Sequence, residues 1–222
     1  NLLITKNFGS NGQVQIYSAA TDSSSNLYFA GYYHYPFTET INGTSITFTR
    51  EYSDLLIGKT DSNGNLLWIK TPEVSTSNSR AFDITIHNDD EIYITGEFFS
   101  ELQLGNYSEN AGGSSNGFLA KINSSGEWQW LTEINNAGTI SSRSLTVDMS
   151  GNPYISGYQY SGLVNYGNGV SVAGCCGDSD AFVAKFDPNG QAQWAKSFGS
   201  SGLDRSYAID SDNSGHLWVG GF

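Results

Sequence analysis

Along most of the chain, hydrophobic and polar residues alternate in short runs that end in polar turns. The segment Phe82-Asp83-Ile84-Thr85-Ile86-His87 alternates strictly, and Leu145-Thr146-Val147-Asp148 follows the same pattern further along. Side chains of a β-strand point alternately to the two faces of a sheet, so a period of two indicates strands with one buried face. The pattern therefore predicts an all-β protein.

One phrase recurs three times and closes on a tryptophan. An Asn-Gly or Ser-Gly turn leads into Trp68, Trp130 and Trp194, which stand 62 and 64 positions apart. A lysine stands nine residues before each tryptophan, after a short apolar run; these lysines are Lys59, Lys121 and Lys185. Two apolar runs joined by such a turn are typical of a β-hairpin.

A second phrase, rich in aromatic and β-branched residues, recurs four times between the tryptophans. It ends each time in a glycine, and the glycines Gly31, Gly96, Gly157 and Gly221 are spaced 65, 61 and 64 positions apart. Each unit then contains four strands, which in the second unit are expected at about 81–86, 91–99, 116–122 and 127–134. The connection between the second and third strands is long and variable, and Ile46-Thr47-Phe48 and Val170-Ser171-Val172 look extended enough to form an extra hairpin there.

Four antiparallel strands at a fixed period are the sequence form of a β-propeller blade. At about 63 residues a unit, the 222 residues hold about 3.5 units of one propeller domain, 1–222. The units cover approximately 8–70, 71–134, 135–198 and an incomplete 199–222. Because closed propellers have about four to eight blades, we expect the chain to be part of a larger propeller of six to eight blades. In a minority interpretation, two chains of about 3.5 units complete a seven-bladed ring.

The two phrases together resemble the SBBP-type bacterial β-propeller repeat. The closest copy runs from Asp180 through Phe182-Val183-Ala184-Lys185 to Gly190 and then Trp194, and Asp148 to Gly157 matches the second half of the pattern. The likeness extends over essentially the whole chain, although Gly58 stands where the other copies have alanine. The resemblance implies an extracellular protein or one at a bacterial cell surface, and it implies no particular chemistry.

The charge of the chain excludes one class of partner. Its 22 acidic and 10 basic residues give a net charge of −12 at pH 7, and the basic residues form no cluster along the sequence. Binding to nucleic acid requires positive charge that displaces counterions from phosphates, so no nucleic-acid partner is expected. No apolar run approaches the roughly 20 residues of a membrane-spanning helix. The first residue is Asn1, from which we expect a mature product or a piece of a longer chain.

Aromatic residues supply the candidate ligand site. The densest cluster lies around residues 32–37, and two further clusters occupy corresponding positions of later units. The candidates are Tyr32, Tyr33, His34, Tyr35, Glu97, Phe99, Tyr158 and Tyr160. Glu97 is singular because it follows a repeat glycine where the other copies have Tyr32, Tyr158 or Phe222. Such rings could line one rim and stack on sugars, or they could be buried against the next unit.

Acidic turns invite a calcium interpretation. Asp210, Asp212 and Ser214 place oxygen ligands at alternate positions, and Gly215 stands at the sixth position, as at the start of an EF-hand loop. The twelfth position is Gly221 rather than the bidentate glutamate of such loops. Asx turns, in which the carboxylate binds its own backbone, account for the same residues without a metal. No other cofactor is expected.

Cys175 and Cys176 are adjacent and are the two cysteines of the chain. A strained vicinal disulfide would form outside the cell, where oxidation persists, and two reduced thiols are the alternative.

The repeat tryptophans and the repeat glycines occur once in each unit, which favours a structural role over binding of one ligand. The tryptophans Trp68, Trp130 and Trp194 are expected to pack between neighbouring units rather than to form a sugar platform. The glycines Gly31, Gly96, Gly157 and Gly221 are structural positions of the same repeat.

No catalytic constellation is apparent: the chain has no HExxH pair and no phosphate-binding loop. We therefore expect a non-catalytic module, secreted or on a cell surface, that binds or adheres to a glycan or a protein. One alternative is a lyase or hydrolase with its site in the central funnel. Another is a structural spacer or assembly component, whose partners are the remainder of a larger propeller or a second chain.

Overall fold

The computed structural model describes residues 13–49, 53–135, 138–160, 162–174, 178–212 and 214–222, and the regular structure in these ranges consists of strands. The sequence prediction of an all-β protein is confirmed. Within the same ranges, no helix is long and apolar enough to cross a membrane.

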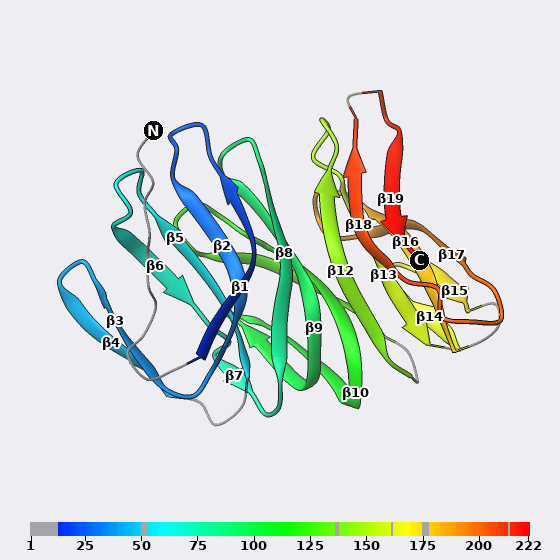
Figure 1. The fold of residues 1–222 in the computed structure, drawn as a ribbon, viewed down its shortest axis with the longest axis horizontal. Helices are drawn as coiled ribbons and strands as arrows, with labels where there is room; N and C mark the ends of the chain where they lie inside the picture. Colours follow the sequence, from blue (N-terminus) through cyan, green and yellow to red (C-terminus); the bar gives the residue numbers. More distant parts are fainter. Residues whose placement is uncertain (1–12, 50–52, 136–137, 161, 175–177, 213) are drawn as a thin grey trace.

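Three antiparallel sheets follow one another along the chain (Figure 1). The first sheet has the order β1 (Gln13–Thr21), β2 (Leu27–His34), β5 (Asp54–Thr60), β6 (Leu66–Lys70). The second contains β8 (Ser79–His87), β9 (Glu91–Leu104), β10 (Tyr107–Ile122) and β11 (Trp128–Ile134), with the short β7 (Val74–Ser75) beside the far end of β9. The third has the order β12 (Ile140–Val147), β13 (Pro153–Tyr160), β16 (Ser179–Phe186), β17 (Ala192–Phe198). A C-terminal hairpin of β18 (Ser206–Ser211) and β19 (Leu217–Gly221) follows.

The long connection between the second and third strands contains an additional hairpin in the first and third sheets. In the first sheet it is formed by β3 (Phe37–Ile41) and β4 (Thr44–Phe48), and in the third by β14 (Leu163–Asn165) and β15 (Ser171–Ala173). In the second sheet β9 and β10 simply continue and turn at residues 105–106. The connection that we expected over residues 100–115 is therefore an extension of two strands.

The third strand of each sheet is buried on both faces; Leu55 and Ile57 of β5 pack toward the second sheet, and Leu56 packs toward the β3–β4 hairpin. All seven residues of β5 are buried, and Leu55, Leu56 and Ile57 have no exposed surface. A strand buried on both sides has no polar face, so it reads as a continuous apolar run rather than as an alternating one. This explains why the runs before the repeat lysines lack a period of two.

The first strands of successive sheets lie side by side in the middle of the molecule (Figure 1). We call β1, β8, β12 and β18 the inner strands. Asp83 on β8 joins three of them: one carboxylate oxygen accepts from Ser18 Oγ of β1 at 2.6 Å. The other accepts from Ser144 Oγ at 2.9 Å and Leu145 N at 2.8 Å on β12. Ser144 Oγ in turn accepts from Ile209 N of β18.

Each inner strand carries a β-bulge opposite a repeat glycine. The register shifts between Ile16 and Ser18, and at the corresponding place in β8, β12 and β18. The bulge pushes the inner backbone against its partner strand, where the glycines Gly31, Gly96, Gly157 and Gly221 stand. A Cβ on any of them would lie well inside 3.0 Å of a backbone carbonyl oxygen. The repeat glycines are thus required by a close approach of two backbones.

A row of tyrosine, lysine and tryptophan crosses the second to fourth strands of each sheet. In the first sheet Lys59 is paired with Tyr28 on one side and Trp68 on the other. The Lys59 ammonium lies 4.8 Å from the centroid of the Tyr28 ring, within the range of a cation–π contact. The row recurs as Tyr93, Lys121 and Trp130, and as Tyr154, Lys185 and Trp194.

The tryptophans of these rows reach the next sheet. Trp68 Nε1 donates to the carbonyl of Ser124 at 3.2 Å, in the turn between β10 and β11. Trp130 Nε1 donates to the carbonyl of Pro188 at 3.1 Å, in the corresponding turn of the third sheet. Their rings are half-buried at this contact, as expected for residues that pack between neighbouring units.

Candidate functional site

The bulges of the inner strands bring four bulky side chains into equivalent positions. Tyr17, Phe82, Arg143 and Tyr207 are the extra residues at the register shifts, because each has no partner in the pairing. A β-bulge redirects a side chain relative to the regular pleat. The ring centroids of Tyr17 and Phe82 lie 5.3 Å apart, and the Arg143 guanidinium lies 4.0 Å from the centroid of Phe82. Residues from three sheets therefore form one surface.

A second set comes from the residue after each repeat glycine. Tyr32 lies 5.7 Å from Tyr17, ring to ring, and the Arg80 guanidinium lies 5.4 Å from the Tyr32 centroid. Arg80 Nη1 also donates to Glu97 Oε1 at 3.2 Å. The other oxygen of Glu97 accepts from Ser141 Oγ at 2.8 Å. Glu97 is buried, so this carboxylate links β8, β9 and β12 rather than facing solvent.

Two arginines meet at one tyrosine at the other end of this surface. Arg143 Nη2 donates to Tyr158 Oη at 2.8 Å, and its guanidinium lies 5.4 Å from the centroid of the same ring. The Arg205 guanidinium lies 4.4 Å from the Tyr158 centroid, and Arg205 Nη2 donates to Tyr160 Oη at 3.1 Å. A hydrogen bond to Tyr207 raises the pKa of Arg205 above its already high ordinary value. Arg205 is thus charged at any physiological pH.

We call this surface the arginine–aromatic band. It comprises Tyr17, Tyr32, Arg80, Phe82, Glu97, Arg143, Tyr158, Tyr160, Arg205 and Tyr207. Phe82 and Tyr158 are buried within it, whereas Tyr17 and Tyr207 are each 44% exposed. The chain has four arginines, and all three that fall in the described ranges belong to the band. A protein with a net charge of −12 therefore gathers guanidinium groups at its inner strands.

The structure divides the eight predicted ligand residues into two groups. Tyr32, Glu97, Tyr158 and Tyr160 all lie in the band. Tyr33, His34, Tyr35 and Phe99 are not among its contacts.

Alternation along β2 separates neighbouring members of the aromatic cluster. Tyr33 is 1% exposed and packs edge-on against Phe37 at 5.1 Å, on the face opposite Tyr32. His34 Nδ1 lies 3.0 Å from Ser53 Oγ, and its ring contacts the exposed Tyr35. Phe99 is half-buried on β9, where its backbone N–H donates to Asn78.

Sequence reasoning missed the three arginines and the bulge residues. The signal was present, because Tyr17, Phe82, Arg143 and Tyr207 each stand 14 positions before a repeat glycine. Their side chains differ in chemistry, so no shared letter marks the position. A search for positions at a constant distance from the repeat glycines, instead of for a constant residue type, would have found these four residues.

The acidic turn near the C-terminus holds its own backbone. Asp212 Oδ1 accepts from the N–H groups of Ser214 at 2.8 Å and His216 at 2.9 Å, and Oδ2 lies 2.8 Å from His216 Nδ1. Asp210 accepts from the backbone of Ser211. Within the described ranges, no three acidic, histidine or cysteine side chains converge as metal ligands would. The Asx-turn interpretation accounts for Asp212, whereas Cys175 and Cys176 lie outside the described residues.

The same turn recurs six times in the described part of the chain. In each case the side-chain oxygen accepts from the N–H groups two and four residues ahead. The residues are Asp22, Asp61, Asn123, Asp148, Asp187 and Asp212.

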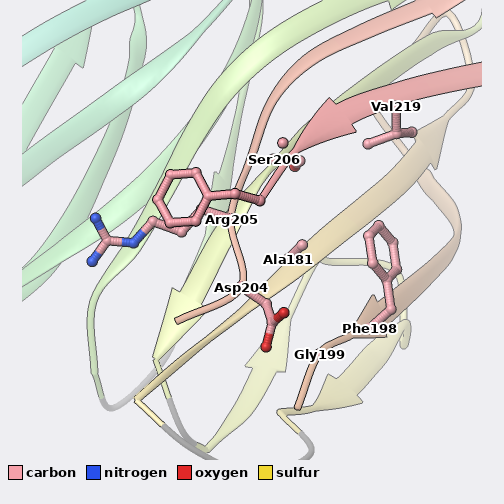
Figure 2. A pocket seen from close by; sticks show the side chains of 9 residues that line it. Ala181, Phe198, Gly199, Asp204, Arg205, Ser206 and Val219 are labelled. Carbon is pink, nitrogen blue, oxygen red and sulfur yellow. The ribbon is translucent and has the colours of Figure 1, made fainter. Parts of the chain in front are cut away.

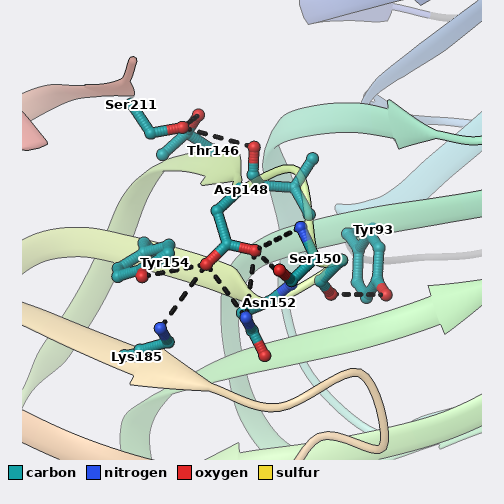
Figure 3. A network of polar contacts seen from close by, with 10 residues as sticks. Tyr93, Thr146, Asp148, Ser150, Asn152, Tyr154, Lys185 and Ser211 are labelled. Atoms are coloured by element: carbon teal, nitrogen blue, oxygen red, sulfur yellow. Dashed lines mark hydrogen bonds and ion pairs between the residues drawn. The ribbon is translucent and has the colours of Figure 1, made fainter. Parts of the chain in front are cut away.

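Asp148 is the most strongly engaged of these turn residues (Figure 3). Its carboxylate also accepts from the side chains of Asn152 and Tyr154, and Lys185 Nζ lies 3.4 Å from Oδ2. Burial by itself raises the pKa of Asp148, but the hydrogen bonds from Asn152, Tyr154 and Ser150 outweigh it and lower the pKa from 3.8 to about 2. The ionised form is therefore stabilised by folding.

The free energy of unfolding should fall as the pH drops from about 4 to 2, because Asp148 is protonated at a higher pH in the unfolded chain than in the folded protein. Because the folded pKa is the lower one, its contribution is present above pH 4 and lost as the pH falls through 2. A shift of this size corresponds to about 2 kcal/mol. Asp148→Asn should reduce stability at pH 6 and flatten the profile from pH 4 to 2, as measured by urea unfolding. An unchanged acid limb in the variant would contradict the assignment.

A hollow of about 270 Å³ lies at the open edge of the C-terminal hairpin (Figure 2). Phe198 and Val219 line it, and Figure 2 shows the Arg205 side chain directed away from it. Asp204 also lines it, but its carboxylate accepts from Ser200 N at 2.6 Å and Ser200 Oγ at 3.0 Å. The carboxylate of Asp204 is thus already bonded to Ser200 of the same loop.

Comparison with known proteins gives one distant likeness. No family model matches the chain. It is 24% identical over 214 residues to an uncharacterized WD repeat-containing protein, L264, of Acanthamoeba polyphaga mimivirus. The match covers 82% of this chain and 15% of that protein, so the chain spans about one seventh of the length of this relative. The likeness agrees with a repeated β-sheet architecture of the propeller type.

Proposed function

We propose that the three sheets and the C-terminal hairpin are blades of a β-propeller with six to eight blades. The support is the repeated four-stranded order, the side-by-side inner strands and the likeness to a WD-repeat protein. Trp218 occupies the place of Tyr28, Tyr93 and Tyr154, yet it is 68% exposed, so a further strand beside β19 would complete its packing. Further repeats or a second chain supply the rest of the ring.

We further propose that the protein is a non-catalytic binding module whose ligand lies on the arginine–aromatic band. The observation that supports this most directly is that half-exposed rings and charged guanidiniums from successive sheets meet on the inner strands. Flat rings beside hydrogen-bond donors suit a glycan, because rings cover the C–H faces of sugars and donors bind their oxygens. Such a module fits a secreted or cell-surface protein that mediates adhesion.

Tyr17→Ala and Tyr207→Ala test this assignment. Each should reduce the signals of the wild-type ligands on a glycan array at least about tenfold, since an exposed aromatic anchor contributes on the order of 1.4 kcal/mol or more to binding. Tyr107→Ala is the matched control, because Tyr107 is also partly exposed but lies at the start of β10, outside the band. Array binding that is unaffected by both band variants, or no glycan binding by the wild type, would overturn the proposal.

A further inference from the structure

We propose that the ligand of the band is an acidic oligosaccharide and that Arg143 and Arg205 bind its carboxylate. This inference rests on the proposed function, because it specifies the chemistry of the ligand at the same site. It follows from the contacts of the three arginines in the band.

Three of the eight lysines and arginines in the described ranges have a carboxylate partner. Arg80 is paired with Glu97, Lys121 with Glu91 and Lys185 with Asp148. Arg143 and Arg205 differ from Arg80, the third arginine of the band, because within the described residues their polar contacts are to hydroxyl groups and their other contacts are aromatic rings. Two guanidiniums on one tyrosine repel each other, and a bound anion would remove this repulsion.

Arg143 also has donors without acceptors. A guanidinium carries five N–H donors, and in the described part of the chain Arg143 directs one of its nitrogens to Tyr158. Its Nε atom is buried and has no hydrogen-bond partner there. A carboxylate matches the planar fork of arginine and can accept two parallel bonds.

The rings beside the arginines favour a sugar as the carrier of this carboxylate. Phe82 holds the Arg143 guanidinium in place at 4.0 Å, while Tyr207 adjoins Arg205 and Tyr17 adjoins Phe82. The two exposed rings therefore flank the charged pair along the band. A uronic-acid chain offers both groups at once, since its carboxylate sits on a pyranose ring whose C–H face can stack on an aromatic side chain.

The proposal is tested by calorimetric titration with a galacturonate oligomer and with its methyl ester, which has the same rings without the charge. The acid form should bind, and the ester at least tenfold more weakly. Arg143→Gln and Arg205→Gln should each weaken binding of the acid about 10- to 100-fold, as expected for loss of a charge-assisted hydrogen bond. Lys196→Gln is the control, because it removes the same charge from an exposed site on β17.

Each outcome distinguishes the two proposals. If ester and acid bind equally and Tyr207→Ala weakens both, the band binds glycans and the carboxylate inference is wrong. If a glutamate-rich peptide binds and the galacturonate does not, both proposals are wrong as stated. Thermal melts check folding, and Arg205→Gln remains informative if Arg143→Gln fails to fold, because Arg205 reaches Tyr158 from the connection before β18, whereas Arg143 lies on β12.

Discussion

Replacing Gly157 by alanine is expected to destabilise the protein by about 3 kcal/mol, which lowers the melting temperature by ~6 to 12 °C. The new Cβ would overlap the carbonyl group of Ser141 on the bulged inner strand, and the ring of Phe182 lies 3.1 Å away on the other side. Because two of these three contacts are backbone atoms, a rotamer change cannot relieve the clash. Thermal denaturation followed by circular dichroism measures the effect.

Gly202→Ala is the matched control for this substitution. Gly202 has no heavy atom within 4 Å of its would-be Cβ, and its backbone does not require glycine. The change should therefore alter stability by less than about 0.5 kcal/mol. Equal melting temperatures for the two variants would show that the bulge tolerates a side chain, and the structural explanation of the repeat glycines would then be wrong.

Asp83→Ala should cost about 3 kcal/mol, because four hydrogen bonds to one carboxylate are lost and the donors on two other strands lose their acceptor. These donors are Ser18 Oγ, Ser144 Oγ and Leu145 N, together with Ile84 N on the same strand. The loss should be visible as a lower midpoint in urea unfolding. It should also speed amide exchange in β1 and β12, since the contacts between inner strands are weakened.

Asp83→Asn separates charge from geometry. The amide retains one acceptor oxygen, so about half of the bonds survive and the loss of stability should be clearly smaller than for alanine. If asparagine and alanine destabilise equally, the ionic character of the group decides its role. If neither destabilises, Asp83 does not hold the inner strands together.

The sequence was sufficient to predict the strands and their period. In the second sheet the strands expected at 81–86 and 127–134 correspond to β8 and β11 within two residues. The segment of β8 alternates hydrophobic and polar residues and ends in the Asp-rich turn at 88–90, and β11 follows the Ser-Gly turn at 125–126. In these segments the local sequence pattern indicates the same strands that the folded protein contains, so the prediction from the pattern succeeded.

The candidate site was less accessible to such reasoning. Tyr32 and Tyr33 are neighbours in sequence but point to opposite faces of β2, so clustering of aromatic letters did not identify one surface. Arg80 and Arg205 are brought to the band by contacts between strands that are distant in sequence. The extension of β9 and β10 was missed because their outer ends, apart from the buried Leu102 and Leu104, are mostly polar and pair mainly with each other.

The additional hairpins give the architecture a division of labour. The repeats differ in length mainly between the second and third strands of each sheet. There β3–β4, the tips of β9–β10 and β14–β15 have different lengths. The inner strands and their bulges lie at the opposite side of each sheet and keep a constant offset from the repeat glycines. Evolution or a protein engineer can therefore lengthen or replace an outer hairpin while the inner register, and with it the band, is retained. The periphery is free to diversify because the centre is fixed by backbone contact.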